Sequence, residues 1–295
     1  MHIGLVGLGK MGFNMRARLR AANIEVTGYD RNPEVTDVAS LQQLVAAVPA
    51  PRLLWVMVPS GAVTSAVISE LADLLEPGDL LIDGGNSRFT EDQKHGEMLA
   101  ASNIGFMDVG VSGGVWGLEN GYGLMAGGSK QDIARAMPVL DALRPDGDRA
   151  DSFVHVGAIG AGHYAKMVHN GIEYGLMQSY AEGYELLARK DIIEDVPGTF
   201  RAWQKGTVVR SWLLDLLVKA LEEDPGLASI DAFVDDSGEG RWTVEEAIAS
   251  GVPAPAITAA LFARFASREE NSPALKMVSA LRHQFGGHAT KPAGS

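Results

Sequence analysis

Four side chains that can hold or move protons recur at helical spacing near the middle of the chain. Lys166, His169, Asn170 and Glu173 stand at positions i, i+3, i+4 and i+7, which share one face of an α-helix. An amine, an imidazole, an amide and a carboxylate on one face suit proton transfer to and from a polyhydroxy substrate. The alternative is an ordinary solvated helix face. The glycine-rich segment 157–162 just upstream, which lets another backbone approach closely, favours the chemical interpretation.

Such a face needs a scaffold, and the start of the chain predicts a dinucleotide-binding domain. Residues 2–6 form an apolar strand-like run, the glycine-rich segment 7–12 follows at once, residues 13–22 have a helical pattern, and a second strand at 25–29 ends in Asp30. This is the Rossmann pattern, in which the first glycine makes the tight turn and the second admits a pyrophosphate. The third lets helix and strand pack closely, and the helix N-terminus donates amides to the phosphates. The alternative is a glycine-rich turn that merely connects strand to helix.

Asp30 bears on the choice of cofactor. A carboxylate at the end of the second strand accepts hydrogen bonds from the adenosine ribose 2′-hydroxyl and repels a 2′-phosphate, which favours NAD. The adjacent Arg31 could bind that phosphate, so NADP stays possible. The residues predicted to bind the cofactor are Gly7, Leu8, Gly9, Lys10, Met11, Gly12, Asp30, Arg31, Met57, Val58 and Asn86.

Five further strand-like runs continue the pattern. They cover residues 53–58, 79–83, 105–111, 122–126 and 153–156. The expected fold class is therefore α/β, with an N-terminal Rossmann-like doubly wound sheet, and ligands of such sheets bind at the carboxyl ends of the strands. Four residues lie just past such ends and are candidate ligand-binding residues, although their types also make ordinary turns. They are Asn86, Ser112, Gly113 and Gly114.

The second half of the chain has a helical pattern. One helix over about 160–190 would be about 45 Å long at the helical rise per residue. Shorter helical segments follow at 197–205, 208–223, 243–250, 255–266 and 273–285. We therefore expect a cofactor-binding domain at residues 1–158. An all-α domain with one long helix is expected at residues 159–295, for substrate binding and dimerisation.

Composition disfavours several kinds of partner. The 295 residues carry a formal net charge of −12, which argues against nucleic acid and anionic membranes. The chain has no cysteine, so neither a disulfide framework nor a Cys-ligated metal is expected, and no metal is predicted. The longest apolar run, 53–58, is far too short to span a bilayer, and no secretory signal is seen. These features favour a cytoplasmic protein.

Four motifs together resemble the 6-phosphogluconate dehydrogenase family of decarboxylating enzymes, over nearly the whole chain. They are the loop 7–12, Ile82-Asp83-Gly84-Gly85-Asn86-Ser87, Gly110-Val111-Ser112-Gly113-Gly114, and Lys166-Met167-Val168-His169-Asn170-Gly171-Ile172-Glu173-Tyr174. The parent β-hydroxyacid dehydrogenases share the Rossmann loop, the Ser-Gly-Gly and the lysine. The continuation at 169–174 is typical of the phosphogluconate branch, and the chain is similar to its short members.

The resemblance implies a role for each matching residue. Lys166 is the general base and later the general acid, and Glu173 is a second acid. Tyr174 and Arg264 bind the substrate phosphate. The residues that hold the sugar acid are Asn86, Ser112, Gly113, Gly114, His169 and Asn170.

The resemblance also implies a shared active site. In the family tail, an Arg and a His six residues later reach the substrate of a neighbouring subunit, and Arg282 and His288 match them. We therefore expect a homodimer or homotetramer. One departure concerns the loop 236–243, which is shorter than in long family members and lacks their lysine, so its phosphate contacts stay open, with Arg241 a possible substitute.

The implied reaction accounts for these residue types. Oxidation of 6-phosphogluconate at C3 places a ketone β to the carboxylate, which then leaves readily as carbon dioxide. Lys166 must first be neutral to take the C3 hydroxyl proton. After carbon dioxide has left, Glu173 protonates C1 of the resulting five-carbon enediol, which gives ribulose 5-phosphate. One alternative is a non-decarboxylating dehydrogenase of a small 3-hydroxy acid, and another is a non-catalytic NAD-binding regulator. The first would not need Arg264, Arg282 and His288, and the second would not explain the polar face around Lys166.

Overall fold

The computed structural model describes residues 1–291 and divides into two compact units. The first is Met1–Asn170 and the second is Gly171–Ser295. Each unit is considered by itself. No helix of the described part is both long and apolar enough to cross a membrane.

The first unit is built on one sheet of seven strands. They are β1 (His2–Val6), β2 (Glu25–Tyr29), β3 (Leu53–Val56), β4 (Leu80–Asp83), β5 (Gly105–Ser112), β6 (Gly123–Gly128) and β7 (Phe153–Gly157), in the order β2-β1-β3-β4-β5-β6-β7. The prediction of seven strands is confirmed, with ends that agree within two residues. The sheet is mixed, because β6 runs antiparallel to β5 while the other neighbours are parallel. Only the short helical turns at Gly114–Trp116 and Gly117–Asn120 connect β5 to β6, too few residues for the crossover that a parallel pair requires.

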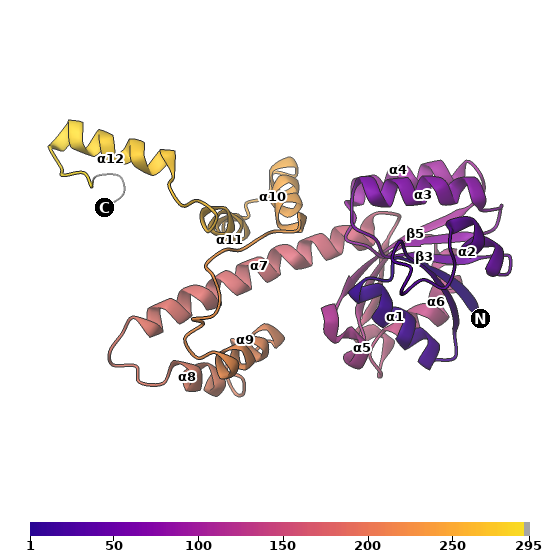
Figure 1. Cartoon of the computed structure of the whole chain (residues 1–295), viewed down its shortest axis with the longest axis horizontal. Helices are drawn as coiled ribbons and strands as arrows, with labels where there is room; N and C mark the ends of the chain where they lie inside the picture. The colour runs from indigo at the N-terminus through magenta and orange to yellow at the C-terminus, as the bar shows by residue number, and fades with distance from the viewer. Residues whose placement is uncertain (292–295) are drawn as a thin grey trace. The chain divides into compact units, whose positions relative to one another are not determined.

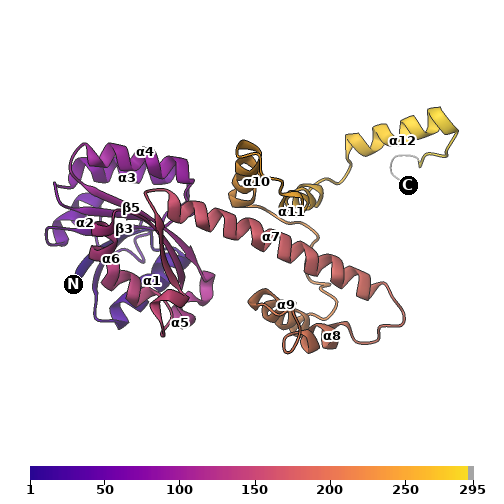
Figure 2. The ribbon, with the colours of Figure 1, turned by 180° about the vertical axis from the view of Figure 1, so that it is seen from behind.

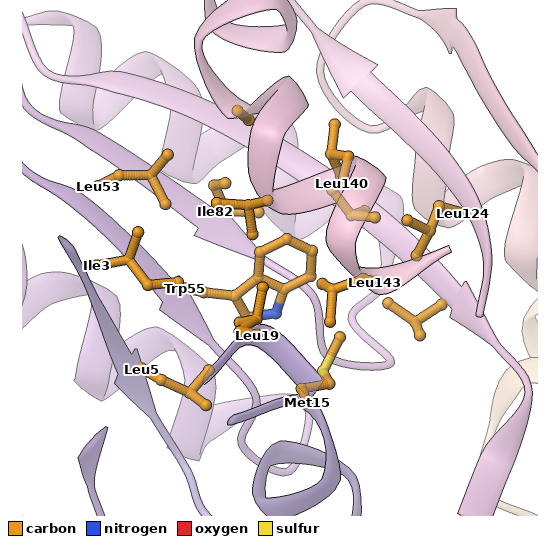
Figure 3. Packing of buried hydrophobic residues seen from close by; sticks show 14 of the residues in the cluster. Ile3, Leu5, Met15, Leu19, Leu53, Trp55, Ile82, Leu124, Leu140 and Leu143 are labelled. Atoms are coloured by element: carbon orange, nitrogen blue, oxygen red, sulfur yellow. The ribbon is translucent and has the colours of Figure 1, made fainter. Parts of the chain in front are cut away.

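Helices cover both faces of this sheet (Figure 1). On one face lie α1 (Lys10–Ala21) and α6 (Lys130–Leu143), and on the other α2 (Leu41–Ala47), α3 (Ala62–Leu74) and α4 (Phe89–Ala100). Figure 3 shows the first of the two resulting cores, where Trp55 of β3 lies among Met15, Leu19 and Leu143. Trp55 is fully buried. This is the predicted Rossmann-like α/β unit.

The long helix is confirmed as α7 (Ala161–Ala188), a single run of 28 residues. At the helical rise per residue it is about 42 Å long. The boundary between the two units falls within it, after Asn170. Its first turns therefore belong to the first unit and the remainder to the second.

The second unit is all-α, as predicted (Figure 2). Its helices after α7 are α8 (Val196–Trp203), α9 (Trp212–Glu223), α10 (Glu239–Ala249), α11 (Pro255–Ala266) and α12 (Pro273–Gly286). Two small apolar clusters hold it together, one around Phe200 and Leu214, the other around Tyr174 and Leu261. Helix α12 has no buried residue.

Candidate active site

The glycine-rich loop has the geometry that its sequence predicts. Gly7 has φ +92°, and a Cβ there would lie 2.3 Å from the Met57 carbonyl oxygen. A Cβ at Gly12 would lie 1.9 Å from the Gly7 carbonyl oxygen, so strand and helix pack through both glycines. At Gly9 a Cβ would meet nothing within 4 Å, although this residue caps α1. No side chain caps the helix and no acidic residue stands in its first turn, so its amides and dipole are available to an anion.

Asp30 is tied to this loop. One carboxylate oxygen accepts a hydrogen bond from the Leu8 backbone N–H at 2.6 Å, and the other accepts one from the Asn32 N–H at 2.8 Å. The carboxylate thus stands beside the loop that it was predicted to serve. Arg31, next to it, is exposed. Met57 is held by a backbone hydrogen bond from its N–H to Val6, at 2.7 Å, and Val58 packs against the core on the α2–α3 face.

The turn that follows β4 presents Asn86 at the carboxyl edge of the sheet. Asn86 is exposed, while Asp83 at the end of the strand is fully buried. Asp83 accepts hydrogen bonds from the Gly85 N–H at 2.9 Å and from the Ser87 hydroxyl at 2.6 Å. The buried carboxylate therefore fixes the conformation of the turn on both sides of Asn86.

Ser112 ends the neighbouring strand, β5. Its hydroxyl oxygen lies 3.4 Å from His169 Nε2, so the structure brings together two residues that are 57 positions apart. Gly113 and Gly114 follow with φ of +138° and +54°, which L side chains rarely adopt. The turn after Ser112 thus depends on both glycines.

The first turns of α7 lie directly against β5. A Cβ at Gly110 would stand 2.5 Å from Lys166 Cβ, so this strand glycine makes room for the helix. Lys166 is only 8% exposed. One turn later His169 is exposed, and its Nδ1 lies 3.1 Å from the side-chain oxygen of Asn170. A buried amine, an exposed imidazole and a partly buried amide thus share one helix face, which is the candidate site for substrate and base.

Sequence reasoning missed a buried charged group beside this site. Asp92 of α4, Asp108 of β5 and His163 of α7 are each at most 2% exposed. His163 Nδ1 lies 2.7 Å from Asp92, and Asp108 accepts the His163 backbone N–H at 2.8 Å. A signal was present, because His163 stands one helical turn before Lys166 and Asp108 interrupts an otherwise apolar strand.

In the second unit, Tyr174 and Arg264 are brought together. The Arg264 guanidinium lies 3.4 Å from the centre of the Tyr174 ring, a cation–π contact, and donates to the Asp235 backbone carbonyl at 2.9 Å. Tyr174 is 5% exposed, and a Cβ at Gly240 would lie 2.4 Å from its ring, so α10 packs directly on it. Glu173, the preceding residue of α7, is partly buried.

Arg241 belongs to the segment 236–243 that was expected to be a loop, but the structure places it in the first turn of α10, where it is already paired. Its guanidinium contacts both carboxylate oxygens of Asp236, at 2.6 and 3.0 Å, and lies 4.4 Å from the centre of the Phe265 ring. This hydrogen bond holds the pKa of Asp236 below its usual value, with a further contribution from Arg268. Asp236 is therefore a carboxylate that anchors the loop.

The two tail residues are exposed. Arg282 lies on α12, and His288 lies just beyond its end, where its carbonyl oxygen is 2.9 Å from His283 Nδ1. Among the described residues of the second unit, no hydrogen bond, ion pair or ring contact joins them to Tyr174 or Arg264.

An uncapped helix N-terminus behind a Gly-x-Gly-x-x-Gly loop, and a buried lysine on a helix that packs on the same sheet, define a nicotinamide-dependent dehydrogenase. The family models agree. Residues 2–160 match the NAD binding domain of 6-phosphogluconate dehydrogenase, and residues 162–291 match the C-terminal domain of that enzyme. The chain belongs to the 6-phosphogluconate dehydrogenase family.

Individual relatives place it among the short members. An NAD(+)-dependent, decarboxylating 6-phosphogluconate dehydrogenase of Haloferax volcanii is 38% identical, with 98% of each chain covered. An NADP(+)-dependent, decarboxylating one of Bacillus subtilis is 34% identical over 94% of this chain but only 64% of its own length. The solved Plasmodium falciparum 6-phosphogluconate dehydrogenase has a TM-score of 0.82 at 26% identity, and covers 100% of this chain and 67% of its own.

Proposed function

We propose that this protein oxidises 6-phosphogluconate at C3 and decarboxylates it to ribulose 5-phosphate and carbon dioxide, with NAD as the hydride acceptor. The observation that carries the proposal is the buried Lys166, seated on Gly110 one turn before His169 and Asn170, on a chain that matches the family over both domains. We assign cofactor binding to residues 1–158, and substrate binding with self-association to residues 159–295.

The cofactor is assigned to the loop Gly7–Gly12. The open space at Gly9 and the uncapped start of α1 fit a pyrophosphate. Asp30 beside the loop favours NAD over NADP, because a carboxylate accepts from a ribose 2′-hydroxyl and repels a 2′-phosphate. The exposed Arg31 keeps NADP possible, and relatives of both preferences exist. When bound, the nicotinamide accepts a hydride from C3.

Lys166 and Glu173 divide the proton transfers. Neutral Lys166 takes the proton of the C3 hydroxyl as the C3–H bond breaks, which leaves a ketone β to the C1 carboxylate. The bond between C1 and C2 then breaks, its electrons pass towards the ketone, and protonated Lys166 returns a proton to that oxygen. Glu173, two turns further along α7, protonates the carbon from which carbon dioxide has left. Glu173 is partly exposed and can exchange its proton with solvent.

The remaining polar residues hold the sugar acid. The assigned residues are Asn86, Ser112, Gly113, Gly114, His169 and Asn170. The Ser112–His169 contact supports this assignment, since it joins a strand end and a helix face at the carboxyl edge of the sheet. The fixed turn around Asn86 presents an amide at the same edge.

Arg264 and Tyr174 are assigned to the phosphate. Within residues 1–291 no carboxylate pairs with the Arg264 guanidinium, which rests on an aromatic ring and a backbone carbonyl, so its charge is not neutralised. Arg241 differs, because Asp236 holds it in a bidentate pair. We therefore infer that Arg241 orders the loop and does not replace the lysine of long family members.

A second copy of the chain completes the site. Helix α12 has 14 residues and none is buried, and a lone helix of this length is marginal in water. Five of its large apolar side chains are exposed, namely Leu275, Met277, Val278, Leu281 and Phe285. We propose a homodimer or homotetramer in which α12 docks on a neighbour and brings Arg282 and His288 to its substrate. That the enzyme works in the cytoplasm stays a prediction.

The test is turnover with carbon balance. The purified protein, NAD and 6-phosphogluconate should yield reduced nicotinamide and carbon dioxide in equal amounts. Reduced nicotinamide without carbon dioxide, or turnover of 3-hydroxyisobutyrate in preference to 6-phosphogluconate, would instead support a non-decarboxylating β-hydroxyacid dehydrogenase. No turnover of any of these acids with either cofactor would refute both.

A further inference from the structure

Four buried ionisable side chains gather behind the candidate site, and the proposed reaction uses none of them. They come from four elements of the first unit: Asp83 from β4, Asp92 from α4, Asp108 from β5 and His163 from α7. Their exposed fractions are 0%, 0%, 0% and 2%. Three carboxylates around one imidazole in the interior is a costly arrangement.

The hydrogen bonds of this group hold the elements that carry the site. Asp108 accepts from the backbone N–H groups of Gly160 and His163, at 2.6 and 2.8 Å, and so anchors the start of α7 to β5. Asp83 anchors the turn around Asn86. The Asp92–His163 contact of 2.7 Å then connects α4, which begins just after that turn, to α7.

Electrostatic attraction strengthens the Asp92–His163 contact between α4 and α7. Burial opposes a positive His163, but the charge of Asp92 and the hydrogen bond to it outweigh burial and raise the pKa of His163 to about 10. Asp83 and Asp108 add to this effect. His163 therefore holds its proton more tightly than Asp92 does, and burial raises the pKa of Asp92 to about 7 against the opposing charge of His163. The positive form of His163 lies among three acidic side chains. Its ring is held by the contact of Nδ1 with Asp92, whereas Nε2 is buried and has no hydrogen-bond partner within residues 1–291.

The position of His163 on α7 suggests that the Asp92–His163 pair orients this helix in addition to any effect on stability. A buried ion pair often stabilises a fold no better than apolar residues of similar volume. His163, however, stands three residues before Lys166 on the same helix, so its ring fixes how far α7 is rotated about its axis. The absence of space at Gly110 fixes how closely the same turns approach β5. Rotation and distance together set where the Lys166 amine lies.

We propose that the Asp92–His163 ion pair is a positioning device that holds Lys166 at the angle and distance which proton transfer from the substrate requires. Asp92 and His163 are positioning residues and touch neither substrate nor cofactor. Loss of the pair lets the first turns of α7 rotate, which lowers kcat while cofactor binding at the separate loop Gly7–Gly12 is kept.

A bound cation is the competing explanation. Ligand atoms of Asp83, Asp92 and His163 lie within 4.8 Å of one another. Asp83 already gives its two oxygens to Gly85 and Ser87, and the Nδ1 of His163 already contacts Asp92. Asp92 Oδ1 and His163 Nε2 are buried without a hydrogen-bond partner among the described residues, so each could still bind a cation. The direct contact between Asp92 and His163 is what favours an ion pair. Metal analysis of the purified protein, and assay after chelation, form the control for this point.

The variants are Asp92→Asn, His163→Gln and the double change, which replaces the ion pair with two neutral groups that can still hydrogen-bond. Asp79→Asn is the matched control, because Asp79 is a 1% exposed aspartate just before β4, at the far end of the strand that Asp83 terminates. The Asp79 carboxylate accepts hydrogen bonds from the backbone N–H and guanidinium of Arg52 and from the backbone N–H of Glu76, away from the site. The kcat is expressed per NADH-binding subunit, measured by fluorescence titration, so that an unfolded fraction does not count.

We expect kcat to fall about 10–100-fold in the Asp92 and His163 variants, as for a displaced catalytic group, with the affinity for NADH within about threefold of wild type. Amide hydrogen exchange should quicken at residues 84–87 and 160–166 in these variants. Asp79→Asn should change neither kcat nor the exchange rates at residues 84–87 and 160–166, even if it lowers the melting temperature. The double variant covers the case in which a single change leaves one buried charge and prevents folding.

Folded variants with wild-type kcat and wild-type exchange would overturn the proposal. So would a loss of kcat that is matched by loss of NADH binding and reversed by chelation or metal addition. The kinetic arm rests on the proposed function, whereas the exchange arm does not. If the wild type fails to oxidise 6-phosphogluconate, the proposed function falls, and exchange at 160–166 still decides whether the pair holds α7.

Discussion

Replacing Gly110 with alanine should displace Lys166 and reduce turnover more than it harms the fold. A Cβ at Gly110 would stand 2.5 Å from Lys166 Cβ and 2.8 Å from the Gly162 carbonyl oxygen, whereas ordinary contacts begin at 3.4 Å. Both clashing atoms are fixed to the backbone of α7, so a rotamer change cannot relieve the contact. The helix must move by about 0.9 Å, the difference between the shorter contact and an ordinary one.

The size of this shift sets the expected effect. A displacement of about 1 Å at a catalytic group can cost up to about 100-fold in rate, so we expect kcat to fall about 10–100-fold. Overpacking of a close contact typically costs about 1–3 kcal/mol, so the protein should still fold. The measurements are steady-state kinetics with 6-phosphogluconate and NAD, and the free energy of unfolding in urea.

Gly183→Ala is the control for this change. Gly183 lies on the same helix, and a Cβ there would meet nothing within 4 Å. Alanine should leave kcat unchanged and stabilise the helix by up to about 1 kcal/mol. A Gly110→Ala enzyme with wild-type kcat and wild-type stability would show that α7 is not seated on β5 as described, and the argument from this contact would fail.

Four further predictions follow from the proposed site. Lys166→Met should bind 6-phosphogluconate yet lose about 100–10,000-fold in kcat, since the base is gone; near-normal turnover would rule out the assignment. Asp30→Ser should narrow or reverse the preference for NAD, judged by kcat/KM with both cofactors, and a wild type that already prefers NADP would contradict the role of Asp30. Co-expressed Arg282→Ala and Lys166→Met chains should regain activity that neither has alone, whereas no rescue in verified mixed oligomers would mean that each tail serves its own chain. Finally, His163 has its pKa raised from 6.5 to about 10 by Asp92, against the effect of burial. Its contribution to stability is therefore fully present below pH 6.5 and lost as the pH rises through about 10, and His163→Gln should flatten the loss of unfolding free energy across that window.

The sequence predicted the parts of this molecule that local patterns determine. The Gly7–Gly12 loop, the strands and α7 were found because glycine spacing and apolar runs are short-range signals. Helices α2, α4 and α6 were not predicted. In α4, Phe89–Ala100 carries acidic, basic and amide side chains and only a few apolar ones, so its apolar pattern is weak. The direction of β6 was not predicted either, since nothing in an apolar strand encodes which way it runs.

In the candidate site too, residues with a local sequence signal were predicted and residues without one were missed. The residues assigned to the site on α7 could be proposed from the sequence because helical spacing places them on one face. Asp92 and Asp108 were missed because their role comes from contacts with a residue 71 and 55 positions away. A lone aspartate within a helix or a strand is usually a surface residue, and only the fold shows that both are buried. Buried charge is thus the feature of this site that sequence reasoning predicts least well.

The two buried aspartates of strand β4 differ in what they hold in place. An aspartate lies at each end of its apolar residues, and both are buried, Asp79 at 1% and Asp83 at 0% exposure. Asp79 is satisfied by Arg52 and by backbone N–H groups, a local arrangement that closes the amino end of the strand. Within residues 1–291, Asp83 accepts hydrogen bonds only from its own turn, and its negative charge also helps to raise the pKa of His163. A carboxylate that orders a turn on one side and stabilises a buried imidazolium on the other couples the Asn86 turn to the helix of Lys166. Asp83, at the carboxyl end of β4, therefore connects two elements of the candidate site, whereas Asp79, at the amino end, makes local structural contacts away from that site.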